Sequence, residues 1–125
     1  MRRNTVFNCL LVLLLIVLGA FFWYNLQSPL AMYPGEAKAK LAKGEFDAVV
    51  DVRTDAEWEL GHLPLAIHIP TGQLKEQLPS RIPNKSARIL FYCNTSTRSR
   101  MAAEAAQSIG YPNVRYLVGT HLNLK

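Results

Sequence analysis

One cysteine in the second half of the chain stands where an apolar run meets a hydroxyl-rich stretch. Residues 89–92 are apolar, Cys93 follows them, and residues 94–99 lead into an alanine-rich helical pattern. The backbone N–H groups of residues 94–99 can turn toward the Cys93 sulfur, and the positive end of the following helix dipole points at it. Both effects, and the guanidinium of Arg98, favour the thiolate over the thiol. The pattern predicts a sulfur nucleophile or a cradle for an anion bound to one.

The predicted site consists of Cys93 as the catalytic nucleophile and a loop that binds substrate. The loop residues are Asn94, Thr95, Ser96, Thr97, Arg98 and Ser99. We expect Arg100, near the helix start, to contribute more weakly to the same electrostatic work. A purely structural role for Cys93 stays open, because free cysteines are among the most buried residue types. The sequence shows no ligand cluster for a metal, and the predicted chemistry needs no cofactor.

The N-terminal residues 1–27 differ in composition from the rest of the chain. Residues 6–24 are almost continuously apolar and follow Arg2 and Arg3, and this length suffices for a helix across a bilayer. A cleaved signal peptide is the alternative, but its cleavage box Pro29-Leu30-Ala31 places proline where a small residue is wanted. We expect residues 1–27 to form an anchor in preference to a cleaved signal, and residues 28–35 to form a tether.

Charges around the apolar segment predict its orientation. Arg2 and Arg3 are the charged residues that precede it, so the positive-inside rule keeps the N-terminus in the cytoplasm. The aromatic residues at 21–24 suit the headgroup level at the other end. We therefore expect a single-pass protein of the cytoplasmic (inner) membrane. Residues 6–24 would lie in the lipid bilayer, and the domain would face the periplasm or another exported compartment.

Length and charge limit the function of the remaining residues. A chain of 125 residues allows one domain after the anchor. Arg2 and Arg3 are two of the 14 basic residues, which leaves a dispersed 12 against 9 acidic ones. This balance argues against a nucleic-acid partner and is compatible with small anionic substrates. Cys9 and Cys93 lie in separate parts of the chain, so we expect no disulfide between them.

Helical and strand patterns alternate after residue 35. Helices are expected over residues 36–43, 55–60, 73–78 and 98–109, and strands over residues 46–52, 66–69, 88–92 and 114–118, with a loop at 79–87. Strands separated by helices indicate an α/β fold in which a parallel sheet has helices on both faces. Ligands bind such sheets at the carboxyl ends of the strands, which is where Cys93 falls.

Three motifs resemble those of the rhodanese-like (sulfurtransferase) domain family. They are DVRTDAEW at residues 51–58, GHLPLAIHIP at 61–70 and YCNTSTRS at 92–99. Their order and spacing match the family over nearly all of residues 34–119. The resemblance implies a small α/β domain with a central parallel sheet, in which Cys93 carries sulfur as a persulfide. On this resemblance the domain extends over residues 36–125.

The resemblance also carries roles for residues outside the loop. Asp51 and Arg53 match the motif at the end of the first strand, and His62 matches the histidine after the glycine. We expect structural roles for all three: Asp51 and Arg53 pin loops by charge-assisted hydrogen bonds, and His62 caps a turn. Trp58 is expected in the core. His68 receives no role.

Two features depart from the family pattern. Ser96 stands where family loops commonly have a glycine that tolerates a positive φ angle. The cradle is therefore either tilted, or Ser96 donates its hydroxyl to the bound anion. The usual C-terminal helix is lacking after Gly119, so one sheet face is expected to be exposed, or covered by a partner or the membrane.

The predicted function is a sulfurtransferase of rhodanese type. It would move sulfur from a small anionic donor such as thiosulfate, through a Cys93 persulfide, to a thiol acceptor on a small molecule or protein. One alternative is a catalytically weak, membrane-tethered binding or sensing module that keeps the fold. Another is a cysteine phosphatase, but such enzymes have five residues between cysteine and arginine, and Cys93 and Arg98 are separated by four.

Overall fold

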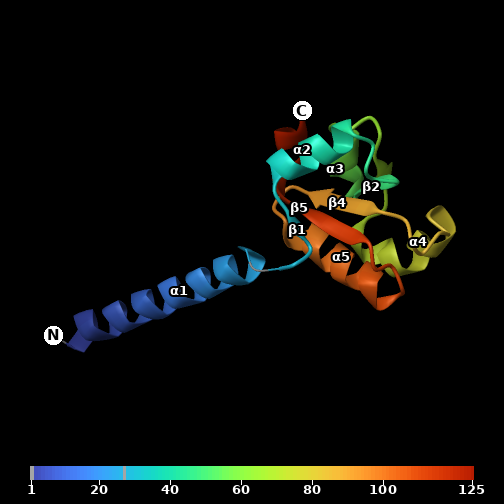
Figure 1. Ribbon diagram of the computed structural model, residues 1–125. Helices are drawn as coiled ribbons and strands as arrows, with labels where there is room; N and C mark the ends of the chain where they lie inside the picture. Colours follow the sequence, from blue (N-terminus) through green and yellow to red (C-terminus); the bar gives the residue numbers. More distant parts are fainter. Residues whose placement is uncertain (1, 27) are drawn as a thin grey trace.

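The computed structural model describes residues 2–26 and 28–125, and it begins with an apolar helix that projects from a folded domain (Figure 1). This helix, α1 (Arg2–Leu26), contains the stretch Arg2–Tyr24, which is long and apolar enough to cross a membrane. Its 23 residues span about 35 Å, against about 30 Å for a bilayer core. None of this stretch is buried against the domain.

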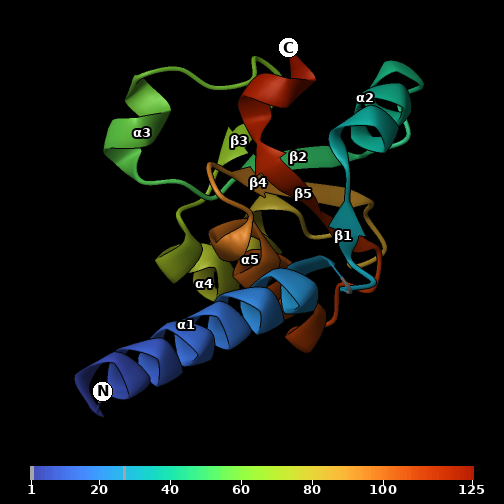
Figure 2. The same cartoon turned by 90° about the vertical axis from the view of Figure 1, so that its left-hand side faces the viewer.

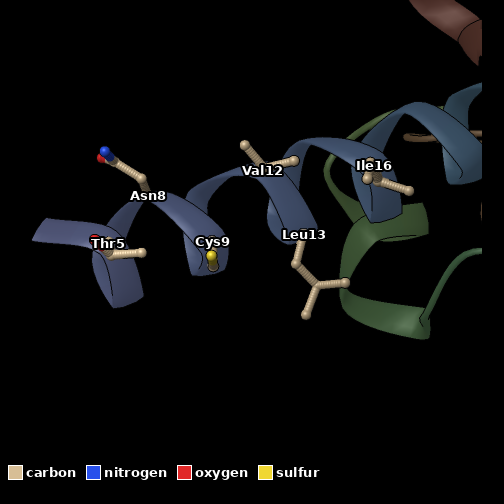
Figure 3. Close-up of a pocket in the computed structure, with 6 residues that line it drawn as sticks. All are labelled: Thr5, Asn8, Cys9, Val12, Leu13 and Ile16. Carbon is tan, nitrogen blue, oxygen red and sulfur yellow. The ribbon is translucent and has the colours of Figure 1, made fainter. Parts of the chain in front are cut away.

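One side of α1 is slightly hollowed, as Figure 3 shows. The hollow is lined by Thr5, Asn8, Cys9, Val12, Leu13 and Ile16. Cys9 is exposed there, whereas Cys93 is buried, and both thiols are free. The two cysteines therefore form no disulfide.

A five-stranded parallel sheet forms the centre of the domain, in the order β1-β5-β4-β2-β3. The strands are β1 (Ala31–Met32), β2 (Ala48–Asp51), β3 (Ile67–His68), β4 (Ile89–Cys93) and β5 (Val114–Thr120). Strand β4 is central, and all five of its residues are buried, as its continuous apolar run predicts. The α/β fold expected from the sequence is confirmed.

Helices cover both faces of the sheet. The helical segments are α2 (Pro34–Ala42), α3 (Asp55–Glu59), η1 (Thr71–Gln73), α4 (Leu74–Arg81), α5 (Thr97–Ser108) and η2 (His121–Leu124). Helices α4 and α5 lie together on one face, and α2 lies with η2 on the other (Figure 2). The buried apolar residues accordingly form two clusters, one on each side of the sheet.

The sheet face expected to be open or covered by a partner is covered by the chain itself. Val49, Leu90, Tyr92 and Leu117 on this face are each at most 2% exposed. They pack with α2 and with Leu124 of η2, the short 3₁₀ segment that follows β5. The expectation of an uncovered face is therefore wrong, because α2 and η2 together fill the layer.

Two segments expected as tether and loop contain regular structure. Residues 28–35 include β1, which pairs with Tyr116 and Leu117 of β5, and the first residues of α2. Helix α4 continues through Pro79 to Arg81, although proline removes one helical hydrogen bond. Burial of Leu74 and Leu78 on the α5 side of the sheet outweighs that loss.

Candidate active site

Cys93 is the last residue of β4, at the carboxyl edge of the sheet, and its side chain is fully buried. Its Sγ accepts a hydrogen bond from the Ser99 N–H at 3.4 Å. Its thiol donates to Ser99 Oγ, also at 3.4 Å, and Ser99 Oγ donates to the carbonyl oxygen of Ser96 at 2.9 Å. Ser99 lies in the first turn of α5, so the sulfur faces the positive end of a 12-residue helix.

The loop does not form the expected ring of N–H groups around the sulfur. Among the loop amides in the described part of the chain, the one that donates to Cys93 Sγ is that of Ser99. Ser96 is the N-cap of α5, so Ser99 is the third residue of the helix. The N–H groups of the first helical turn have no partner within the helix, and that of Ser99 is therefore available to the sulfur. The helix start, rather than the whole loop, thus supplies the observed hydrogen bond to sulfur.

Ser96 adopts the left-handed backbone conformation that the family's glycine would adopt, with φ of 70°. Its Oγ accepts a hydrogen bond from the Gly119 N–H at 2.6 Å, and its carbonyl accepts one from Arg100 N–H at 2.8 Å. Strain at this position is therefore offset by contacts to β5 and α5. The Ser96 hydroxyl thus ties the loop to the scaffold as an acceptor, and donation of its proton to a bound anion stays a prediction.

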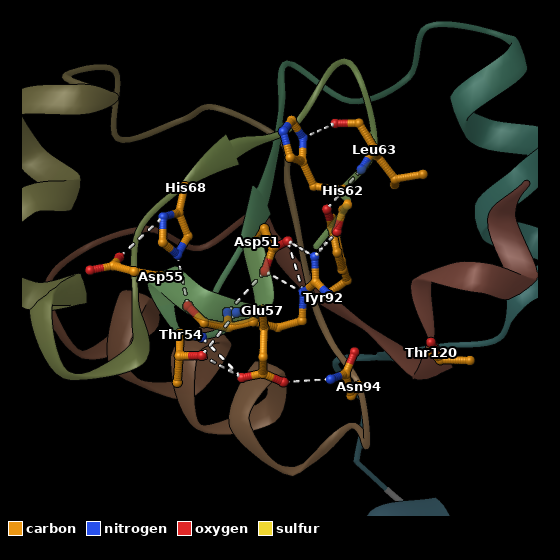
Figure 4. Close-up of polar contacts among 12 residues, drawn as sticks. Asp51, Thr54, Asp55, Glu57, His62, Leu63, His68, Tyr92, Asn94 and Thr120 are labelled. Atoms are coloured by element: carbon orange, nitrogen blue, oxygen red, sulfur yellow. Dashed lines mark hydrogen bonds and ion pairs between the residues drawn. The ribbon is translucent and has the colours of Figure 1, made fainter. Parts of the chain in front are cut away.

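The two ends of the loop are held by one carboxylate, that of Glu57 in α3, and Figure 4 shows its contact with Asn94. Glu57 Oε1 accepts from Arg98 Nη1 at 2.6 Å, and its Oε2 accepts from Arg98 Nη2 at 3.0 Å and from Asn94 Nδ2. Thr54 completes a capping box with Glu57 at the start of α3. Arg98 thus closes the loop through Glu57, and it lies close enough to Cys93 for an electrostatic interaction.

Glu57 also makes the loop sensitive to acid. The Arg98 guanidinium lowers the pKa of Glu57 from its ordinary 4.5 to about 2. A lowered carboxylate pKa stabilises the fold above pH 4.5, and this stabilisation is lost as the pH falls toward 2. We expect wild type to be more stable than Glu57→Gln at pH 6 and the two to converge near pH 2. Urea unfolding at several pH values measures this, and a constant difference would contradict it.

Asp51 and Arg53 form a buried ion pair at the end of β2. Asp51 is fully buried and Arg53 is 4% exposed. The carboxylate accepts from the Arg53 N–H at 2.9 Å, from Nε at 3.0 Å and from Nη2 at 2.7 Å. Arg53 Nη2 also donates to the Gly61 carbonyl at 2.6 Å, so the pair holds the turn after α3. The hydrogen bonds from Asp51 raise the pKa of Arg53 above its ordinary value.

Trp58 lies outside the core, between two histidines. Its ring stacks on His62 at a centroid distance of 3.3 Å and on His68 at 4.8 Å. His62 Nδ1 lies 3.0 Å from the Leu63 carbonyl, and His68 Nε2 lies 2.7 Å from the Arg53 carbonyl (Figure 4). The expectation of a core tryptophan is wrong because α3 is short and buries none of its residues. The stack joins α3 to the segment that leads into β3.

Arg100 lies elsewhere than the sequence predicts, and His121 has contacts that the sequence does not predict. Arg100 does not join the Cys93 cradle; its guanidinium lies 3.3 Å from the Tyr24 ring centroid and donates to Glu104 at 2.8 Å. His121 follows β5, stacks on Tyr92 and has a buried Nδ1 without a hydrogen-bond partner. Burial lowers the pKa of His121. No local pattern in the sequence marks either contact, whereas the Thr-x-x-Glu capping box could have drawn attention to Glu57.

The described residues contain no group of three or more His, Cys, Asp or Glu side chains that could hold a metal ion. The chemistry available at the site is that of a thiol at a helix N-terminus, with a carboxylate–guanidinium pair closing the loop above it. Such a site can hold a sulfur nucleophile and attract an anionic substrate.

Comparison with known proteins agrees with this geometry. The E. coli (strain K12) thiosulfate sulfurtransferase PspE is 32% identical over 65 residues, which are 52% of this chain and 62% of PspE. The Candida albicans adenylyltransferase and sulfurtransferase UBA4 is 29% identical over 101 residues, 69% of this chain and 23% of that protein. The chain therefore spans less than two thirds of the length of either relative.

A solved structure shows the same fold over most of the chain. The human single-domain sulfurtransferase TSTD1 superposes with a TM-score of 0.68 at 25% identity, covering 77% of this chain and 95% of that one. The family model described as the rhodanese-like domain matches residues 33–120, from the residue before α2 to the end of β5. The chain belongs to the rhodanese-like domain family, and PspE and TSTD1, to which it is similar, are named as sulfurtransferases.

Proposed function

We propose that the chain is a sulfurtransferase that carries sulfane sulfur as a persulfide on Cys93. The observation that carries this proposal is the position of Cys93 Sγ at the end of β4, hydrogen-bonded to the Ser99 N–H at the start of α5. A helix N-terminus favours the anionic form of sulfur that attacks a donor and the anionic persulfide that results. Relatives named as sulfurtransferases support the same chemistry.

The reaction has two balanced steps. The Cys93 thiolate attacks the outer sulfur of thiosulfate, a new S–S bond forms, and sulfite leaves with the electron pair of the old one. A thiolate acceptor then attacks the outer sulfur of the persulfide, and Cys93 leaves as a thiolate. Arg98, held by Glu57, supplies the cation that attracts the anionic donor to the loop.

The direct test is the intact mass of the protein after treatment with thiosulfate. In a Cys9→Ser background we expect one added sulfur atom, which dithiothreitol removes, and no addition when Cys93→Ser is also present. Cys9→Ser is the control because Cys9 is the second free thiol of the chain. A folded, reduced protein that gains no sulfur would favour a binding module of the same fold.

Two observations favour that binding module as the second candidate. Cys93 has no exposed surface, and Ser96 holds the loop closed through Gly119. A donor reaches the sulfur when this loop opens, and a loop that stays shut would leave a fold without turnover. A phosphatase is less well supported, because the four residues between Cys93 and Arg98 leave room for one sulfur atom rather than a phosphoryl group.

We also propose that α1 anchors the domain in the cytoplasmic membrane, with the N-terminus inside and the domain on the exported side. Its length and apolar composition support the span, and Arg2 and Arg3 support the orientation. We expect the protein to stay in the membrane fraction after an alkaline wash. In intact spheroplasts, external protease should digest the domain; digestion after lysis alone would contradict the orientation, and a soluble product beginning near residue 32 would indicate a cleaved signal.

A further inference from the structure

The C-terminal end of α1 is bound to the domain by a buried arginine. Arg100, 8% exposed, donates through Nη1 to the Tyr24 carbonyl at 2.6 Å, and its guanidinium carbon lies 3.3 Å from the Tyr24 ring centroid. The last turn of α1 contains no basic residue of its own. Arg100 therefore supplies the positive charge that stabilises the carbonyl end of a helix. We call this contact the Arg100–Tyr24 clamp.

The connection from α1 to the sheet is short and hydrogen-bonded. Four residues separate Leu26, the last residue of α1, from Ala31, the first of β1. Leu30 O accepts from Tyr116 N–H at 2.9 Å, and Arg115 Nη2 donates to Ala31 O at 2.8 Å. Arg100 thus contacts the last turn of α1 at Tyr24, and the pairing of β1 with β5 holds the chain a few residues further on. The contact at Arg100 holds the end of α1 against α5.

The Cys93 loop lies on the side of the domain from which α1 projects, as Figures 1 and 2 show. Ser99, which contacts the sulfur, and Arg100, which contacts Tyr24, are adjacent residues of α5. Two consecutive residues of α5 therefore contact the sulfur and the end of the apolar helix. Tyr24 and its exposed neighbour Trp23 are residues that favour the headgroup level.

From this arrangement we propose that the clamp holds the Cys93 loop against the bilayer surface, where it passes sulfur to a cysteine thiol of another membrane protein. This inference rests on the proposed function and on the proposed anchor. In the step, the acceptor thiolate attacks the outer sulfur of the Cys93 persulfide. The bond between that sulfur and Cys93 Sγ breaks, and Cys93 leaves as a thiolate. The acceptor gains the sulfur and no redox reagent is consumed.

A transfer assay in vesicles tests which acceptors the loop reaches. The full chain is reconstituted, loaded with thiosulfate and offered either a lipid with a thiol headgroup or soluble glutathione at equal total concentration. We expect transfer to the thiol lipid to be faster by at least about tenfold, because confinement to one surface raises its effective concentration. Equal rates would overturn the proposal.

Variants of the clamp show whether the preference for the thiol lipid depends on the clamp or on membrane anchoring alone. Tyr24→Leu removes the ring under Arg100 while keeping an apolar span, and Trp23→Leu is the matched control one residue away. We expect Tyr24→Leu to lose most of the preference for the thiol lipid and Trp23→Leu to keep it, with glutathione rates unchanged in both. A preference that survives in Tyr24→Leu and in Arg100→Met would overturn the role of the clamp.

Fluorescence quenching by lipids tests whether the Cys93 loop lies at the bilayer surface, and it needs no catalysis. In a Cys9→Ser, Cys93→Ser background, a fluorophore is attached at Thr95→Cys, an exposed position in the loop, or at Lys43→Cys, an exposed position before β2 at the opposite edge of the sheet. We expect lipids with a quencher on the headgroup to quench the loop fluorophore alone. Quenching at both positions or at neither would overturn the proposal. Selective quenching without transfer to any thiol would overturn the proposed sulfurtransferase function and leave the placement supported.

Discussion

Cys93→Ser abolishes sulfur transfer from thiosulfate to cyanide, the largest single effect that we expect for this chain. A serine hydroxyl at neutral pH has no anionic fraction comparable to that of a thiol, so the attack on the donor loses its nucleophile. The substitution exchanges one atom, the sulfur that accepts from the Ser99 N–H at 3.4 Å, for a smaller oxygen. We expect a loss of at least about 10³-fold in kcat/KM, because the substitution removes the nucleophile.

Two controls make this result specific to the site. Cys9→Ser removes the other free thiol, which is exposed on α1, and we expect it to leave the rate unchanged. Circular dichroism is used to check that Cys93→Ser is folded. If wild type, folded and reduced, is as inactive as Cys93→Ser, the chain is a binding module and the sulfurtransferase proposal fails.

The fold was largely predictable because its information is local. The apolar run that becomes β4 and the alanine-rich segment that becomes α5 each carry a strong pattern, and their order fixes a parallel sheet. Strand β1 was missed for the opposite reason. It has two residues, and its partner β5 lies more than 80 residues along the chain, so no window of sequence contains the pairing.

The same limit explains which parts of the site were predictable. Cys93 stands at the boundary of a strand and a helix, which local patterns reveal. The contacts from Glu57 to Asn94 and Arg98 cross 37 and 41 residues, and the contact from Arg100 to Tyr24 crosses 76. Motif spacing indicates that such residues belong to one site, but their pairing depends on how α3 lies against the loop and how the end of α1 lies against α5.

Asp51→Ala is expected to cause the largest loss of stability, about 3–5 kcal/mol. Removing the carboxylate leaves the Arg53 guanidinium buried beside the sheet without its partner, and an uncompensated buried charge is costly. The Gly61 carbonyl would keep one hydrogen bond to Arg53, which does not neutralise the charge. Urea unfolding of the full chain in micelles measures the loss, with Trp58 fluorescence read in a Trp23→Phe background.

Matched variants distinguish the effect of burial on stability from the effect of having an ion pair at all. Asp47 and Arg88 form a pair of the same chemistry whose side chains are 46% and 51% exposed, so solvent screens it and Asp47→Ala should cost much less. Replacing both buried partners, Asp51→Val with Arg53→Met, should cost less than the sum of the two single substitutions, because no charge is left unpaired. Equal losses for Asp51→Ala and Asp47→Ala would show that burial of the first pair contributes nothing. A strictly additive double variant would show that Asp51 and Arg53 stabilise the domain through separate contacts and not as an ion pair.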